Sequence, residues 1–330
     1  MKRNFIEKVI DRMQYQLDSN QTKELKMILI SEMQQYELRE NKENVVHRQE
    51  ENKKLLYLFI SAKKVEGCSS KTLVYYENTI NCFLDKIEVA LSRIETNDIR
   101  EYLAKYQEEK KSSKVTIDNM RRIFSSFFAW LEDEDYIAKS PVRRIHKIKT
   151  NVLVKDVLSD EELENLRDNC DEIRDLAIID LLSSTGIRIG ELIKLNREDI
   201  NFQERQCVVF GKGNKERTVY FNARTKIHLQ KYLSTRDDNN SALFVSLHSP
   251  HNRMSINGIE YRLKELGKKL NIAKVHPHKF RRTLATMAID KGMPIEQVQC
   301  LLGHVRIDTT LHYAMVNQNN VKMAHRKFIG

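Results

Sequence analysis

The chain has 330 residues, a length that suits two domains, each large enough to bury a core. Its residues are 41% hydrophobic and 31% charged, which fits a globular protein better than a disordered one. No apolar run approaches the roughly 20 residues of a membrane span, and the charge-interrupted start MKRNFIEKVIDRMQ does not fit a secretion signal. The 56 Lys and Arg residues outnumber the 46 Asp and Glu residues, so the net charge is +10 and nucleic acid is the expected partner.

Cysteine, proline and glycine usage narrows the class of protein further. The five cysteines are far apart and form no C-x-x-C pair, so we expect neither disulfides nor a zinc site, and we expect a reducing cytosol. With 4 prolines and 10 glycines, strands and tight turns must be few, and the chain is expected to be mainly helical.

Residues 1–47 are expected to form a helical extension of two amphipathic helices, separated at DSNQ (18–21). So short a hairpin cannot bury its own apolar face. We expect it to pack on the following domain, and the alternatives are a role in assembly or in binding accessory DNA sites.

Residues 48–137 are predicted to form a compact domain of four helices, KKLLYLFISAKKV, SSKTLVYYENTINCFLDKI, TNDIREYLAKYQ and KVTIDNMRRIFSSFFAWLEDEDYI. Serine caps begin the second helix, and Thr96 or Asn97 is expected to cap the third. The fourth carries aromatic residues at i, i+3 and i+4 spacing, which predicts a buried stripe made of Phe124, Phe127, Phe128 and Trp130.

Residues 138–156 are expected to be a basic linker between the two domains. Pro141 blocks helix continuation, and no acidic residue occurs in the segment before Asp156. Such a linker could follow a phosphate backbone or could be a solvated connector. The candidate DNA contacts in it are Arg143, Arg144 and Lys147.

Residues 157–330 are expected to form a second, mostly helical domain. Ser159 and Glu162 have the spacing of a capping box, and RQCVVF and ERTVYF flank GKGNK as a β-hairpin. The predicted fold class is therefore mainly α with a small β-hairpin or sheet.

Taken one at a time, the motifs that could carry chemistry are weak. GKGNK meets neither the P-loop nor the dinucleotide fingerprint. His278 and Arg281 share a helix face in PHKFRRT, and Arg188 begins a helix, but taken alone such residues usually have surface or capping roles. His304 and Tyr313, in LLGHVRIDTTLHYA, could be core residues. Neither a metal-ligand pattern nor a G-x-S-x-G elbow occurs, so no metal and no cofactor are expected.

Taken together, these residue types suit phosphoryl transfer. Two arginines offer planar, permanently charged donors to phosphate oxygens, a lysine can donate a proton, and two histidines can donate or accept one. A tyrosine, with a pKa of about 10, needs cationic neighbours and a base before it can attack phosphorus.

The ordered motifs TGIRIGEL, GKGNKER, PHKFRRT and LLGHVRIDTTLHY resemble those of the tyrosine recombinase (phage integrase) family. The resemblance implies a SAM-like core-binding domain at 48–137 and a catalytic domain at 157–330. It also carries over all six positions of the family's active-site signature, which are Arg188, Lys212, His278, Arg281, His304 and Tyr313.

The roles implied by the resemblance form one reaction. Tyr313 is the nucleophile and makes a 3′-phosphotyrosyl link to DNA, while Arg188 and Arg281 clamp the phosphate. Lys212 protonates the leaving 5′-oxygen. His278 helps to move the tyrosine proton, and His304 hydrogen-bonds the phosphate.

Neighbouring positions add a supporting residue and two departures from the family pattern. Glu191, one helical turn after Arg188, matches an acidic position of the motif and is expected to orient that arginine. Arg282 replaces the histidine that many members carry, adds charge beside the phosphate and is a further candidate DNA contact. Phe280 replaces the usual leucine.

The resemblance also implies partners and a setting. The expected substrate is a pair of double-stranded DNA recombination sites. A homotetramer would hold these sites and exchange their strands through a Holliday junction, and the protein could be a monomer in free solution. The expected location is cytoplasmic, on the bacterial nucleoid. Two other functions remain open, a type IB-like topoisomerase and a non-catalytic DNA-binding regulator. The target sequence and the biological role, such as moving a mobile element, cannot be read from the residues.

Overall fold

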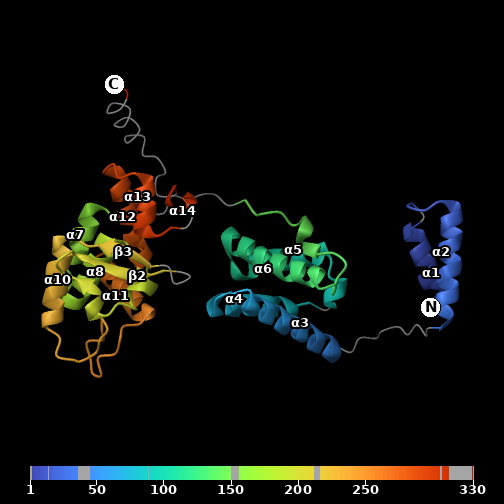
Figure 1. The fold of residues 1–330 in the computed structure, drawn as a ribbon, viewed down its shortest axis with the longest axis horizontal. Coiled ribbons are helices and arrows are strands. Elements are labelled where there is room, and N and C mark those ends of the chain that lie inside the picture. The colour runs from blue at the N-terminus through green and yellow to red at the C-terminus, as the bar shows by residue number, and fades with distance from the viewer. Residues whose placement is uncertain are drawn as a thin grey trace. The chain divides into compact units, whose positions relative to one another are not determined.

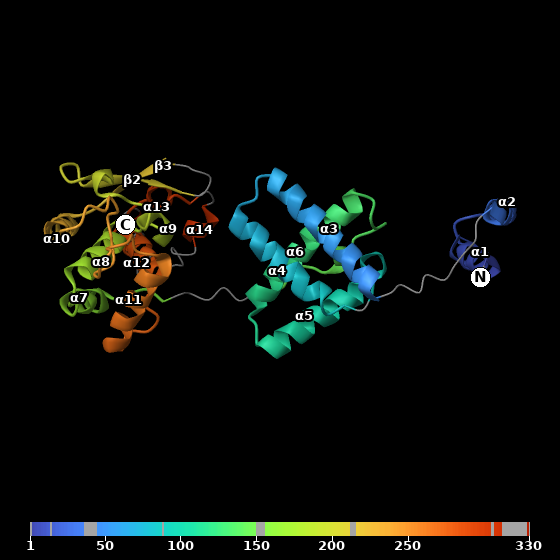
Figure 2. The same ribbon diagram turned by 90° about the horizontal axis from the view of Figure 1, so that it is seen from below.

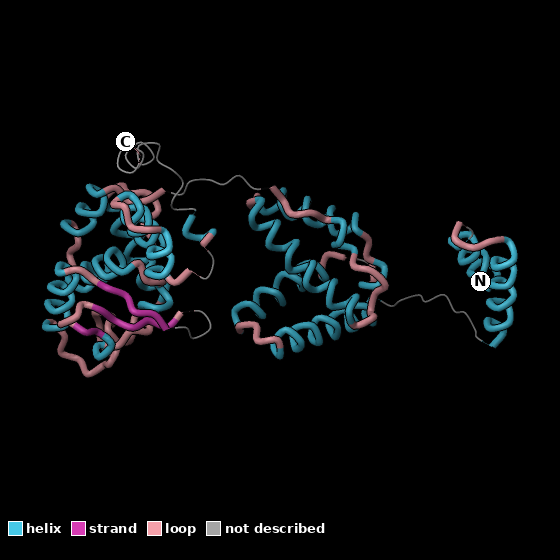
Figure 3. The backbone as a smooth tube through the Cα atoms, turned by 45° about the horizontal axis from the view of Figure 1, so that its top comes forward, coloured by secondary structure: helices cyan, strands magenta, loops and turns pink. Residues whose placement is uncertain are grey.

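The computed structural model describes residues 2–13, 15–35, 45–87, 89–149, 156–211, 216–304, 307–311 and 329. Its contacts divide the chain into two compact units, Met1–Asn151 and Val152–Gly330. Helices dominate both units, and the only strands among the described residues form one small sheet in the second unit (Figure 3). The predicted fold class is confirmed. No helix in the described ranges is long and apolar enough to cross a membrane.

The first two helices are α1 (Lys2–Met13) and α2 (Ser19–Glu32), followed by a 3-10 turn, η1 (Met33–Gln35). The second helix begins inside the break predicted at 18–21, because Asp18 already caps α2, so the break lies earlier in the chain than predicted. Its carboxylate accepts from the backbone N–H groups of Asn20 and Gln21, and the Gln21 side chain accepts from the N–H of Asp18.

The rest of the first unit is a four-helix body built around α6, in which helices α3 and α4 run as one pair beside α5 and α6 (Figure 1). The aromatic side chains predicted to be buried on α6 are buried, and Phe59 and Phe83 from α3 and α4 pack edge-on against them. The bounds of the four helices are Val45–Val65 (α3), Ser70–Leu84 (α4), Thr96–Lys110 (α5) and Lys114–Asp133 (α6).

Two predicted helix starts have different outcomes. Ser69 caps α4 through a hydrogen bond from the Thr72 N–H, as predicted. The expected cap of α5 at Thr96 or Asn97 is wrong, because Glu95 is the N-cap and its N–H donates to the carboxylate of Asp98. The Thr96 hydroxyl instead donates to the carbonyl of Pro141, 2.8 Å away. The side chain that the local sequence predicted as the helix cap therefore makes a tertiary contact.

Part of the segment expected as a linker packs on the first unit. After α6 the chain makes a 3-10 turn, η3 (Pro141–Arg144), in which Val142 is buried. Further along, the N–H of Ile148 donates to the carboxylate of Asp118, which is 4% exposed and also accepts from Arg121 and Arg122. A buried carboxylate on α6 therefore holds the chain as it leaves this unit.

The second unit is built around a buried central helix, α8 (Ile173–Thr185). In Figure 2 the strands β2 and β3 lie along one side of the unit, and α7 and α11 lie along the opposite side. The helices are α7 (Asp160–Asp168), α8 (Ile173–Thr185), α9 (Ile189–Leu192), α10 (Ala223–Ser234), α11 (Ile256–Lys269), α12 (Pro277–Asp290), α13 (Ile295–Leu302) and α14 (Asp308–Leu311), with a 3-10 turn, η4 (Arg197–Asp199).

The sheet is antiparallel in the order β1 (Ile200–Asn201), β2 (Gln206–Phe210) and β3 (Glu216–Tyr220). The predicted β2–β3 hairpin is confirmed, with Val208 opposite Thr218. Cys207 and Val209 point into the core, as the two-residue period of a strand requires, and Val208 between them is exposed. Strand β1 was not predicted, because a two-residue strand carries no periodicity.

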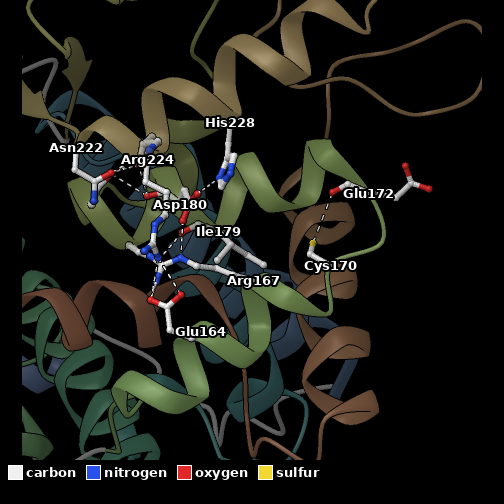
Figure 4. A network of polar contacts seen from close by, with 12 residues as sticks. Glu164, Arg167, Cys170, Glu172, Ile179, Asp180, Asn222, Arg224 and His228 are labelled. Atoms are coloured by element: carbon white, nitrogen blue, oxygen red, sulfur yellow. Dashed lines mark hydrogen bonds and ion pairs between the residues drawn. The ribbon is translucent and has the colours of Figure 1, made fainter.

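A polar network fixes α7 and α10 against α8 (Figure 4). The Asp180 carboxylate on α8 is 1% exposed and is paired with Arg167 of α7, 2.7 Å away, and with His228 of α10. Glu164 accepts from both Arg167 and Arg224. A buried carboxylate is tolerated only when it is paired, so this network holds three helices in one relative position.

Candidate active site

The C-terminal end of α13 is the centre of the candidate site. The last carbonyl groups of any α-helix lack partners within the helix and carry partial negative charge. Here three arginines from three different elements supply the missing hydrogen-bond donors, and each donates to a successive carbonyl. The pairs are Arg217 with Leu301 at 3.3 Å, Arg281 with Leu302 at 2.5 Å, and Arg188 with Gly303 at 3.0 Å.

Arg281 comes from α12 and lies between two helix ends. Its side chain is among the largest that are fully buried, at 1% exposure. One terminal nitrogen donates to Leu302 at the end of α13, and the other donates to the carbonyl of Gly186 at the end of α8, 2.6 Å away. Both carbonyl groups lie at negative helix ends, which stabilise the cation and fix the plane of its guanidinium.

Gly186 is needed where Arg281 meets α8. Its φ is +60°, in the left-handed region where glycine has no steric penalty. A Cβ atom added there would lie 2.8 Å from a methyl group of Leu284 and 3.0 Å from one of Leu302. Glycine is therefore favoured in the TGIR turn, because a side chain there would strain the backbone and displace both leucines.

Arg188 begins α9 and is tied to Glu191. Its backbone N–H donates to one oxygen of the Glu191 carboxylate at 2.8 Å, and its Nη1 donates to the other at 2.9 Å. Its Nη2 reaches Gly303. The Arg188 side chain is nevertheless 41% exposed, so its guanidinium still faces solvent while two fixed partners hold it.

Arg217, which sequence reasoning missed, completes the arrangement from β3. Its two terminal nitrogens donate to the two Glu191 oxygens at 2.8 and 2.7 Å, a bidentate pair. Its side chain also packs against Gly303, where φ is +64° and an added Cβ would lie 2.8 Å from the Arg217 Cδ. The two-residue period of a strand does not single out one arginine as functional. The only available signal was that Arg217 is the last residue of the motif GKGNKER.

Glu191 is the buried carboxylate that joins these arginines, at 4% exposure. Burial alone would raise its pKa. Hydrogen bonds from Arg217 and from the Arg188 backbone outweigh that effect and leave the pKa below its usual value. Glu191 therefore stays ionised and holds both guanidinium groups by charge-assisted hydrogen bonds.

His304 follows the helix end directly. Its backbone N–H donates to the carbonyl of Gln299, and the Gln299 side chain donates to the carbonyl of His304 at 2.9 Å. Burial, and then the charges of Arg281 and Arg188, lower the pKa of His304 to about 4. The imidazole is therefore neutral near pH 7, with one N–H donor and one acceptor nitrogen.

His278 lies in the first turn of α12, where it is exposed. It is among the groups whose charge lowers the pKa of His304, which brings it into the same neighbourhood. The helix itself is capped by His276, whose ring accepts from the N–H of Lys279. Burial, and then Arg282, lower the pKa of His276.

Arg282, a candidate DNA contact from the sequence, is buried at 9% exposure. Its Nε has no hydrogen-bond partner among the described residues. Burial does not distinguish it from Arg281, which is less exposed still, but the hydrogen-bond partners of the two residues differ. Arg281 and not Arg282 is the arginine whose guanidinium reaches the end of α13.

The structure brings together Arg188, Glu191, His278, Arg281 and His304 from three separate motifs of the sequence. Lys212, between β2 and β3, and Tyr313, after α14, lie outside the described residues. Arg143, Arg144 and Lys147 belong to the other unit.

The electrostatics of the site favour an anion. Arg188, Arg217 and Arg281 bring three positive charges close to the single negative charge of Glu191. Fixed guanidinium groups suit the oxygens of a phosphate, because each presents several N–H donors in one plane. Within the described ranges, no three His, Cys, Asp or Glu side chains come together as a metal site would require.

Two family profiles match this chain. The profile of the Phage integrase family matches residues 156–320, and that of the Phage integrase N-terminal SAM-like domain matches residues 55–138. Curated relatives include the tyrosine recombinase XerC of Staphylococcus aureus strain bovine RF122 / ET3-1, which is 31% identical over 81% of this chain and 93% of its own length. The XerC protein of Oceanobacillus iheyensis is 30% identical over 82% of this chain and 93% of its own length.

Solved structures share the fold. The Tn1549 transposon integrase in complex with transposon right end DNA has a TM-score of 0.70 at 20% identity, covering 84% of this chain and 99% of that one. A lambda integrase dimer bound to a core site has a TM-score of 0.67 at 19% identity, covering 79% of this chain and 94% of that one.

Proposed function

This chain belongs to the phage integrase family of tyrosine recombinases, and on that premise we propose that it is a site-specific DNA recombinase. The observation that carries the proposal is the convergence of Arg188, Arg281 and His304 at one helix end, with positive charge in excess. Preorganised cations of this kind stabilise the charge that develops on phosphorus in a transition state.

In the proposed reaction, the phenolic oxygen of Tyr313 forms a bond to the phosphorus of a DNA phosphodiester. The bond from that phosphorus to the 5′-oxygen breaks, which leaves a 3′-phosphotyrosyl link and a 5′-hydroxyl. His278 takes part in moving the phenol proton, and Lys212 gives a proton to the leaving 5′-oxygen. A 5′-hydroxyl from a second duplex then reverses the attack, so the bond energy is conserved without a nucleotide cofactor.

The described residues divide the remaining work. Arg188 and Arg281 would hold the non-bridging oxygens, and neutral His304 would donate a hydrogen bond to the same phosphate. Glu191, itself paired with Arg217, would keep Arg188 in place. Arg281 contacts two helix ends at once, so it could not move without breaking both contacts.

The assembly belongs to the proposal as well. Four copies acting on two duplexes would exchange strands in two steps through a Holliday junction. The solved structures that share the fold include complexes with DNA, among them the Tn1549 transposon integrase with a circular intermediate DNA. We propose that double-stranded DNA is the partner here too, in the bacterial cytoplasm.

The test is to trap covalent protein–DNA adducts on genomic DNA and to sequence the attached ends, with Tyr313→Phe as the control. We expect adducts at a few defined sites from the natural chain and none from the variant. Adducts scattered along the genome would favour a type IB-like topoisomerase instead. If the natural chain and the variant gave the same background, the proposed function would fail.

A further inference from the structure

Thr310 makes a contact with His304 that no motif of the sequence predicted. The Nδ1 atom of His304 lies 2.8 Å from the Oγ1 of Thr310. Thr310 is fully buried, and its backbone N–H donates to Ile307 at the start of α14. The hydroxyl is thus fixed against one nitrogen of the ring at a position that water does not reach.

The His304 ring is neutral, so its contact with Thr310 can determine which ring nitrogen carries the single proton. Burial disfavours a second proton on the ring, and the nearby charges of Arg281, Arg188, His278 and Arg217 act in the same direction. A neutral imidazole carries its single proton on either Nδ1 or Nε2, and the partner of one nitrogen determines the state of the other. A threonine hydroxyl can donate or accept, so both tautomers fit the distance.

The ligand distinguishes between the two tautomers. A phosphate oxygen only accepts hydrogen bonds, so a lone pair at Nε2 would repel it and an N–H there would bind it. We propose that Thr310 is a positioning residue whose hydroxyl donates to Nδ1 of His304, so that the imidazole presents an N–H at Nε2 to the scissile phosphate. This inference rests on the proposed function for its ligand, although the tautomer itself can be measured without DNA.

The place of Thr310 in the chain gives the contact a second consequence. Thr310 lies on α14 (Asp308–Leu311), three residues before Tyr313 in the sequence. One hydrogen bond therefore ties the residue that would bind the phosphate to the helix that leads to the nucleophile. Loss of the hydroxyl should affect the chemical step more than DNA binding, because neither partner is a main source of the positive charge.

The experiment measures the tautomer in the full chain by long-range proton–nitrogen NMR of selectively ¹⁵N-histidine-labelled protein. His304 is assigned among the ten histidines by its absence in His304→Gln. At neutral pH we expect an unprotonated Nδ1 and a protonated Nε2 in the natural chain and in Thr310→Ser. In Thr310→Val, which keeps the shape and removes the hydroxyl, we expect mixed tautomers.

The same variants are then compared in single-turnover cleavage of a trapped DNA site. We expect Thr310→Val to cleave about 10- to 100-fold more slowly with unchanged DNA affinity, and Thr310→Ser to stay near the natural rate. A melting curve shows whether the valine variant is folded, and the serine variant shows that the hydroxyl and not the methyl group is needed.

Two results would overturn the inference. One is a protonated Nδ1 in the natural chain at neutral pH, which would make Thr310 the acceptor. The other is a natural cleavage rate in a folded Thr310→Val protein. The proposed function fails separately, if the natural chain forms no covalent adduct with DNA whatever its tautomer.

Discussion

Two adjacent arginines, Arg281 and Arg282, have opposite environments although they share a helix and are both buried. Successive helical residues point about 100° apart, so only one of them can face the end of α13. Arg281 donates to Gly186 and Leu302, whereas the Nε of Arg282 has no partner among the described residues. The family resemblance assigned the phosphate clamp to Arg281, and these contacts support that assignment.

We therefore predict that Arg281→Lys slows single-turnover DNA cleavage by about 10²- to 10³-fold, the effect of losing one transition-state donor. A lysine ammonium keeps the charge but cannot donate to two carbonyl groups and a phosphate in one plane. The matched control is Arg282→Lys, a buried neighbour with the same change, which should cleave within about tenfold of the natural rate. The reverse order of the two rates would assign the clamp to Arg282.

The pKa of His304 leads to a prediction about pH. The unfolded histidine has a pKa of 6.5 and the folded one a pKa of about 4, so between these values the unfolded chain binds more protons. The stability linked to neutral His304 is present above about pH 6.5 and is lost as the pH falls toward 4. An NMR titration should show the His304 ring changing below pH 5, and DNA should raise that pKa because a phosphate stabilises the cation. Titration of this ring near pH 6.5 in free protein would contradict the prediction.

At the scale of elements, the end of α13 is a junction of β3, α9 and α12. Arg217 and Glu191 are both largely buried, and each would leave a buried charge behind if its partner were removed. The junction therefore depends on the pair and not on either residue alone.

We predict that Arg217→Ala lowers the free energy of unfolding of the second unit by about 3–5 kcal/mol, because it leaves Glu191 without its bidentate partner. The double variant with Glu191→Ala should cost less than the sum of the two single changes. Hydrogen exchange of β3 and α13 peptides measures the second unit, since the fluorescence of the only tryptophan, Trp130, reports on the first. Strictly additive costs would show that the pair is not coupled.

Much of this element structure follows from the sequence, for identifiable reasons. The apolar spacing in α6 predicted its buried face, and the strand pattern on both sides of GKGNK predicted the hairpin. The predicted start of α5 was wrong because Thr96 has a partner 45 residues away, at Pro141. The local sequence carries no signal of such a distant contact. Strand β1 is too short to show a period.

The candidate site was predictable only in part. Arg188, His278, Arg281 and His304 follow from ordered motifs whose meaning comes from resemblance and not from spacing alone. Arg217 and Thr310 were missed because their partners, Glu191 and His304, become neighbours only after folding. A side chain that acts through another one has no local signature in a single sequence.

For the molecule as a whole, we propose that basic side chains on the first unit make a further contact with DNA. A hollow of about 420 Å³ there is lined by the start of α5 and by η3, and its basic side chains are Arg100, Lys139, Arg143 and Arg144. Arg144 is exposed, and Arg143 remains 66% exposed although it lies 3.5 Å from Glu132. This surface could neutralise phosphates of the backbone without reading bases.

We predict that changing both Arg143 and Arg144 to Gln weakens DNA binding and lowers the slope of log affinity against log salt by about 1–2, because each phosphate contact contributes about 0.9. Changing both to Lys keeps the charges and should leave that slope within error. Binding isotherms over a range of salt concentrations provide the measurement. An unchanged slope in the glutamine variant would exclude this surface from contact with the DNA backbone.

We propose that the hydroxyl of Tyr313 becomes esterified to the DNA phosphate that the arginines at the end of α13 would hold. The most direct measurement is mass spectrometry of the peptide–nucleotide conjugate recovered after the full chain reacts with a nicked DNA site and is digested. We expect one conjugate, with the phosphate of a 3′-terminal nucleotide on Tyr313, and none from Tyr313→Phe. A conjugate on any other residue, or cleaved DNA with no attached peptide, would contradict it.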